Sequence, residues 1–135
     1  GEALPFGDGE FGAVFVVVTL CFADDPLGLL AEARRVLSRE GRVVLGLVPA
    51  ESPWGGRYAD QAARGHRFYS RARFFTLPEL ERLVQESLLR IDRTASTLFQ
   101  DPEEAPPIVE SPREGMSAEA GFVAVSCCRA KGETK

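Results

Sequence analysis

Two apolar runs constrain the fold of this chain more than any other feature. Residues 11–19 are almost all β-branched, aromatic or small, and residues 42–48 have the same character. Neither run alternates with polar side chains. Strands with this composition are typically buried on both faces, as in a parallel sheet covered by helices. The sequence therefore predicts two buried, neighbouring, parallel strands.

A helix is predicted between the two runs. Asp25 is placed to cap its start, Pro26 suits its first turn, and Gly41 is placed to end it. A strand, a helix and a strand with short connections form a parallel unit, predicted here over residues 11–48. The helix stripe facing the strands consists of Leu29, Leu30, Ala33, Val36 and Leu37.

The next segment, residues 49–75, is rich in Gly, Pro, Arg and aromatic residues and has no clean period. We expect it to be irregular and locally basic. A further helix is predicted to begin after Thr76, because Thr76 and Glu79 have the spacing of a capping box. This helix opens the third part of the chain, residues 76–130.

Two more strands are predicted, over residues 89–99 and 121–128, with a proline-rich acidic loop at 100–120 between them. Residues 131–135 are expected to be a frayed tail. The predicted fold is a single partial α/β domain over residues 1–130. Its sheet is partial and doubly wound, with about four strands, mostly parallel, and an antiparallel last strand.

Composition excludes several classes of function. Sixteen basic and twenty acidic residues give a net charge of -4, which disfavours nucleic-acid binding. No apolar run approaches the ~20 residues that cross a bilayer, and the first residues, which have no basic region, are not expected to form a secretory signal. Three unpaired-looking cysteines, Cys21, Cys127 and Cys128, favour a reduced cytoplasmic protein. The single histidine, His66, argues against a metal site built on several imidazoles.

Four segments, in this order and at this spacing, resemble the carboxyl-terminal half of a class I S-adenosylmethionine-dependent methyltransferase of the small-molecule type, which is Rossmann-like. They are Glu2-Ala3-Leu4-Pro5-Phe6, Asp8-Gly9-Glu10-Phe11-Gly12-Ala13-Val14, Glu32-Ala33-Arg34-Arg35-Val36-Leu37 and Gly41-Arg42-Val43-Val44.

The resemblance implies S-adenosylmethionine as cofactor. The family's glycine-rich loop and the acidic residue that holds the cofactor ribose would precede Glu2, so we expect binding and activity only when the amino-terminal half is supplied. The alternative is that Leu4 and Phe6 are core residues and Glu2 is a frayed end. As the resemblance implies, the adenine would lie against Glu2, Ala3 and Leu4, and the methionine part beside Thr19, Leu20 and Cys21.

Substrate-binding residues, which we call the substrate wall, are expected in residues 49–75, the segment rich in arginine and aromatic side chains. Ligands of doubly wound sheets lie outside the carboxyl ends of the strands, and this segment follows such an end. Its aromatic members offer apolar faces with polar tips, and its arginines could grip a carboxylate. His66 is a candidate base, with a surface histidine as the alternative reading. The expected substrate contacts are Trp54, Arg57, Tyr58, Arg67 and Tyr69.

The strand at residues 13–18 is expected to have an open edge, because the strand that would pair with it is missing. An open, flat, apolar edge is a template for association. We therefore expect a homodimer or a partner chain there. Two functions stay open: part of a small-molecule methyltransferase, or a non-catalytic dimerisation or binding module. An NAD-dependent enzyme is disfavoured, because no pyrophosphate-binding loop is present.

Overall fold

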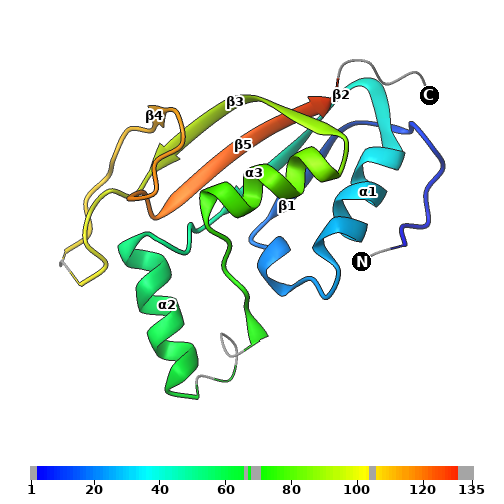
Figure 1. Cartoon of the computed structure of the whole chain (residues 1–135). Coiled ribbons are helices and arrows are strands. Elements are labelled where there is room, and N and C mark those ends of the chain that lie inside the picture. Colours follow the sequence, from blue (N-terminus) through cyan, green and yellow to red (C-terminus); the bar gives the residue numbers. More distant parts are fainter. Residues whose placement is uncertain (1–2, 66, 68–70, 104–105, 131–135) are drawn as a thin grey trace.

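The computed structural model describes residues 3–65, 67, 71–103 and 106–130. Within them, helices pack on a five-stranded sheet of order β1-β2-β5-β3-β4 (Figure 1). The elements are β1 (Phe11–Val17), a short 3-10 turn (Leu20–Phe22), α1 (Pro26–Val36), β2 (Leu37–Leu47), α2 (Pro53–Ala63), α3 (Leu77–Glu86), β3 (Leu89–Thr97), β4 (Arg113–Glu114) and β5 (Phe122–Arg129).

The pairing of the sheet corrects one prediction. Only β1 and β2 pair in parallel among the described strands, whereas β2–β5, β5–β3 and β3–β4 are antiparallel. The prediction of a mostly parallel sheet is therefore wrong in its pairing. The physical reason is the position of β5. Strands β2 and β3 run in the same direction, but β5 lies between them and runs in the opposite direction, so each of them pairs with β5 in antiparallel fashion. Two-residue β4 also adds a strand within the predicted loop.

Helix α1 begins as predicted and ends earlier. The Asp25 side chain accepts a hydrogen bond from the backbone N–H of Gly28, and Pro26 lies in the first turn. The chain becomes extended at Leu37, so Gly41 lies inside β2 instead of ending the helix. A Cβ at Gly41 would lie 2.9 Å from the carbonyl oxygen of Gly12. This glycine therefore allows a close approach beside the irregular register of β1 and β2.

Residues 49–75, predicted to be irregular, contain helix α2. The hydroxyl of Ser52 caps it by accepting from the N–H of Gly55 at 2.9 Å, and Pro53 opens the first turn. Most of α2 extends away from the sheet, so its sequence lacks the apolar stripe of a core helix (Figure 1). The capping box of α3 is confirmed: Thr76 N–H donates to Glu79, and Glu79 N–H donates to Thr76 Oγ1 at 3.2 Å.

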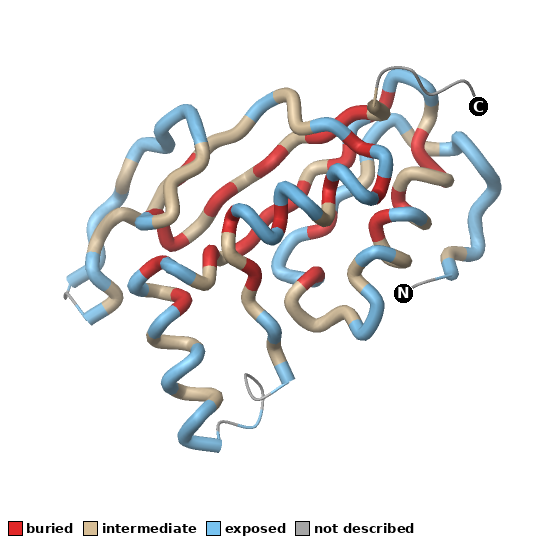
Figure 2. Tube along the Cα trace, viewed as in Figure 1, coloured by how far each residue is buried: buried red, intermediate tan, exposed pale blue. Residues whose placement is uncertain are grey.

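The core lies between one face of the sheet and helices α1 and α3. Alternate residues of the central strands β2 and β5 are buried there (Figure 2). Only Val16 of β1 is buried, and Phe15 is 66% exposed on the opposite face. Burial of this strand on both faces was predicted wrongly for these residues, because an apolar run does not reveal what covers it. The largest fully buried side chains include Leu30, Leu37, Leu45, Leu80, Val43, Val84, Val123 and Val125.

Among the described residues, no helix combines the length and apolarity that a transmembrane span requires.

Candidate functional site

A cavity of about 250 Å³ lies where the carboxyl ends of β1, β2 and β3 meet helix α2. The chain leaves β1 through Val18 and β3 through Leu98, and both residues adopt positive φ, 49° and 62°. Positive φ is an uncommon conformation for β-branched valine and for bulky leucine. Strain at two strand ends that line one cavity marks this edge of the sheet as the candidate site. Its lining is Val18, Cys21, Phe22, Val48, Trp54, Tyr58, Phe74, Leu98, Gly121 and Phe122.

The aromatic wall of the cavity is held rigidly. Trp54 Nε1 donates a hydrogen bond to the carbonyl of Gln100 at 2.9 Å. Its ring lies against Gly121, where an added Cβ would come within 2.4 Å of Trp54 Cδ1. Tyr58 stacks on Phe74 with ring centroids 5.7 Å apart and planes 13° apart. The hydrogen bond and the ring contacts therefore hold these aromatic lining residues in fixed positions.

Arg57 has a structural contact instead of facing the cavity. Its Nη1 donates to the carbonyl of Pro102 at 2.7 Å and lies 3.5 Å from a Glu103 carboxylate oxygen. Together with the bond from Trp54, this ties α2 to the loop after β3. Arg67 is exposed and is not among the lining residues. His66 and Tyr69 lie outside the described residues.

The residues expected at the cofactor are divided between two places. Cys21 lines the cavity, Leu20 is buried beside it, and the hydroxyl of exposed Thr19 donates to the carbonyl of Val17. Leu4 lies along α1, where its N–H donates to Glu32 at 2.7 Å.

The remaining members of that set add no contact to the cavity. Ala3 is exposed, neither it nor Leu4 lines the cavity, and Glu2 lies outside the described residues. The structure thus brings Cys21 together with Trp54 and Tyr58, which belonged to the expected substrate wall.

Cys21 is not an activated nucleophile. Burial raises the pKa of its thiol, so the protonated form dominates at neutral pH. Its Sγ lies 3.9 Å from the carbonyl oxygen of Val18. Cys21 contributes a small, weakly polar surface to the cavity.

Sequence reasoning missed most of the apolar lining. Phe74 lies in the segment expected to bind substrate, but nothing in its spacing singled it out. Leu98, Gly121 and Phe122 reach the cavity only because β5 inserts beside β2, and sequence alone did not predict that strand order.

Comparison with a solved structure decides the fold. A crystal structure of an S-adenosylmethionine-dependent methyltransferase from Thermotoga maritima, described as a possible histamine N-methyltransferase, superposes with a TM-score of 0.85 at 35% identity. The alignment covers 95% of this chain and 60% of that one. This chain has the fold of the class I S-adenosylmethionine-dependent methyltransferases. The profile of the methyltransferase domain family matches residues 1–45.

This chain is also similar to proteins from other organisms. An uncharacterised protein of Mycobacterium tuberculosis is 43% identical over 135 residues, all of this chain and 47% of its own length. One from Methanocaldococcus jannaschii is 31% identical over 93% of this chain and 60% of its own length. A Methanosarcina mazei methyltransferase structure shares the fold at 17% identity with a TM-score of 0.62, covering 96% of this chain and 65% of that one. The chain spans about half the length of the curated relatives it matches.

Proposed function

We propose that this chain is the acceptor-binding part of an S-adenosylmethionine-dependent methyltransferase that acts on a small molecule. The observation that carries the proposal is the aromatic cavity at the carboxyl ends of β1, β2 and β3 in a methyltransferase fold. Ligands of open α/β sheets bind outside the carboxyl ends of the strands. The cavity lies on that side of this sheet.

The lining of the cavity favours a neutral, flat acceptor. None of its ten lining residues is charged. Burying an ionised group there without a partner would be costly, and a cavity of about 150 Å³ is already enough for benzene. The volume of about 250 Å³ therefore suits one substituted aromatic ring or a fused pair. The rigid faces of Trp54 and Tyr58 would stack on such a ring.

Three residues after β1 would lie on the methionine side of the cofactor. Thr19, Leu20 and Cys21 follow β1 directly, beside the cavity, where the methionine part would meet the acceptor. No acidic side chain lines the cavity to take the ribose hydroxyls. Bound S-adenosylmethionine would supply an electrophilic methyl group. The chain would contribute acceptor alignment and water exclusion, with His66 a candidate base for the acceptor proton.

Two titrations test the proposal. Trp54 is the single tryptophan, so its fluorescence reports directly on cavity occupancy. We expect phenol to change that emission saturably, and benzoate to bind about tenfold more weakly because its carboxylate would be buried without a partner. In parallel, calorimetry compares S-adenosylmethionine binding by this chain and by the longer Mycobacterium tuberculosis relative. Cofactor binding by the relative supports the proposal, and no binding by either protein contradicts it.

A second candidate function is a dimerisation or binding module, favoured by the outer edge of β1. No described strand pairs with that edge, and Phe15 and Val17 on the bare face are 66% and 49% exposed. A second copy of this chain or a separate chain would pair along residues 13–18. Unpaired backbone groups beside exposed apolar side chains favour such an association.

A further inference from the structure

The chain between β3 and β4 passes helix α2 and then returns to the sheet. Its two described arms are an outgoing arm, residues 99–103, and a returning arm, residues 106–110, which we together call the strap. The strap begins directly after Leu98, the residue of positive φ that ends β3. None of the described strap residues lines the aromatic cavity. The strap is therefore a separate element beside the candidate site.

The side chain of Gln100 joins the two arms. Its Nε2 donates to the carbonyl of Ile108 at 2.8 Å, and the N–H of Ile108 donates to its Oε1 at 3.0 Å. The amide of glutamine is both donor and acceptor, so this reciprocal pair uses both of its ends. Two bonds in opposite directions fix the orientation of the side chain. Gln100 thereby holds the outgoing arm against the returning arm.

Glu110 makes a second connection between the arms. Its Oε1 accepts from the N–H of Phe99 at 2.9 Å, and its Oε2 accepts from the N–H of Gln100 at 3.1 Å and from the Gln100 side-chain amide. The bond from the Gln100 side chain, and then that from Phe99, lowers the pKa of Glu110, so this carboxylate is ionised near neutral pH. Hydrogen bonds to an ionised acceptor are stronger than neutral ones. A glutamine at this position would offer one acceptor oxygen in place of two.

The strap is also bonded to α2 at two points about one helical turn apart. Trp54 Nε1 donates to the carbonyl of Gln100 at 2.9 Å, and Arg57 Nη1 donates to that of Pro102 at 2.7 Å. Most of α2 extends away from the sheet, so these bonds help to fix the part of the helix that borders the cavity (Figure 1). Gln100 therefore holds the returning arm through its side chain and the indole of Trp54 through its carbonyl.

We propose that the strap positions Trp54 for the acceptor, with Gln100 and Glu110 as positioning residues outside the cavity. This inference rests on the proposed function, because it takes the aromatic cavity as the acceptor site. Loss of either connection between the arms frees the Gln100 carbonyl to move, and the indole bonded to it moves as well. A loosened indole binds a flat ring less tightly, because it loses more conformational freedom when the ring binds.

Acrylamide quenching of the single tryptophan tests the strap without any ligand. Gln100→Ala keeps the carbonyl that accepts from Trp54 and removes the side-chain bonds to the returning arm. Glu110→Gln keeps the size of the side chain and removes one acceptor oxygen. We expect the quenching constant of Trp54 to rise in both variants, measured well below each melting temperature so that the folded state is observed.

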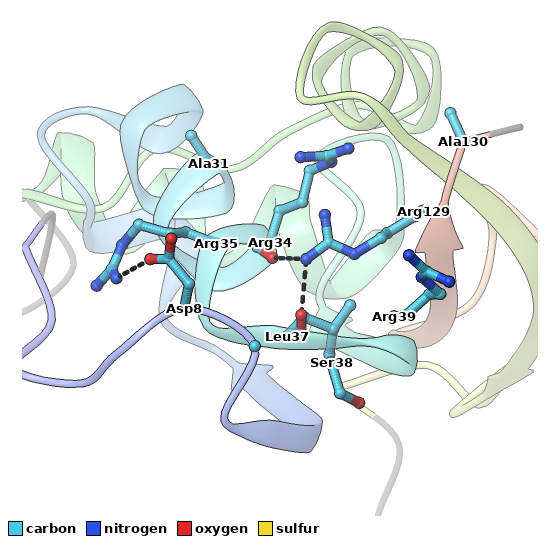
Figure 3. A pocket seen from close by; sticks show the side chains of 10 residues that line it. Asp8, Ala31, Arg34, Arg35, Leu37, Ser38, Arg39, Arg129 and Ala130 are labelled. Atoms are coloured by element: carbon cyan, nitrogen blue, oxygen red, sulfur yellow. Dashed lines mark hydrogen bonds and ion pairs between the residues drawn. The ribbon is translucent and has the colours of Figure 1, made fainter. Parts of the chain in front are cut away.

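Asp8→Asn is the matched control. This carboxylate also holds a local contact, to Arg35 at 2.7 Å, but it precedes β1 and lies at the opposite end of the sheet from the aromatic cavity (Figure 3). We expect its quenching constant to equal that of the wild type. Unchanged quenching in both strap variants, or an equal rise in Asp8→Asn, would overturn the proposal.

Calorimetry with phenol tests whether the effect reaches the cavity through the indole. Glu110→Gln is expected to weaken phenol binding about threefold to tenfold, and Asp8→Asn less than about twofold. In Trp54→Phe, which has no indole N–H, adding Glu110→Gln should change phenol affinity less than about twofold. The full loss on addition of Glu110→Gln to Trp54→Phe would refute the positioning of the acceptor through Trp54. Failure of the wild-type chain to bind phenol counts against the proposed function, whereas the quenching result still decides whether the strap holds Trp54.

Discussion

Trp54 and Gly121 are in direct contact, so the smallest side chain at position 121 would collide with the indole ring. A Cβ there would lie 2.4 Å from Trp54 Cδ1 and 2.8 Å from Nε1. Gly121 precedes β5, and its N–H donates to the carbonyl of Leu98 at 2.8 Å. The pair thus joins α2, the end of β3 and the start of β5 around the aromatic cavity.

Replacing Gly121 by alanine is therefore expected to displace Trp54. Added volume in a packed site typically costs about 1–3 kcal/mol of unfolding free energy. We expect a loss in that range by urea denaturation, a shifted tryptophan emission and weaker phenol binding. Gly56→Ala is the control, since a Cβ at exposed Gly56 in α2 meets nothing within 4 Å. Alanine there should stabilise the chain by roughly 0.4–1 kcal/mol. Unchanged stability and emission in Gly121→Ala would contradict this contact.

Sequence patterns predicted those features that are encoded locally. The start of α1 at Asp25 and Pro26 follows from capping chemistry, and so does the reciprocal pair of Thr76 and Glu79 in α3. The neighbouring parallel strands β1 and β2 also follow from their apolar runs and the helix between them. The caps depend on side chains only a few residues apart, and the parallel pairing depends on one short strand-helix-strand unit.

Features set by distant parts of the chain could not be predicted in the same way. Glycine is a typical residue at the end of a helix, but Gly41 lies inside β2 and allows that strand to approach the Gly12 carbonyl closely. The insertion of β5 depends on tertiary pairing, so the lining of the cavity by Gly121 and Phe122 was not visible in the sequence. Trp54 and Tyr58 were expected in a substrate wall because of their chemistry, but helix α2 that carries them was missed.

The ion pair of Glu32 and Arg35 predicts a pH dependence of stability. Hydrogen bonds from Arg35 and from the Leu4 N–H lower the pKa of Glu32 from 4.5 to about 2. A depressed carboxyl pKa stabilises the folded state above the unfolded value, and this contribution is lost as pH falls from about 5 toward 2. We expect Glu32→Gln to be less stable than wild type at pH 7, with the difference closing as pH falls through that window.

Urea denaturation at a series of pH values measures that difference. Glu81→Gln, an exposed change on α3, is the control and should follow the wild-type profile. A constant gap between Glu32→Gln and wild type from pH 7 to about pH 2 would argue against the ion pair as its cause.

The exposed face of β1 predicts association. Phe15→Lys places a charge beside the open edge and is expected to weaken self-association or partner binding, since charged side chains protect sheet edges. Sedimentation velocity over a range of concentrations measures the effect. Val109→Lys is the matched control, because Val109 is fully exposed in the loop between β3 and β4 and lies outside this face. A wild-type chain that stays monomeric at its highest soluble concentration would exclude the homodimer.

The thiols give an independent measure of cavity occupancy. Burial raises the pKa of Cys127 to about 12, with a smaller contribution from the charge of Asp92, and Cys127 is fully buried. We expect it to resist iodoacetamide at pH 8 until the chain unfolds, because alkylation needs an accessible thiolate. Half-buried Cys21, which lines the aromatic cavity, should be alkylated first, and more slowly when phenol is bound. Peptide mass spectrometry distinguishes the two sites. Protection of Cys21 that is equal with phenol and with benzoate would show that the cavity does not select neutral rings.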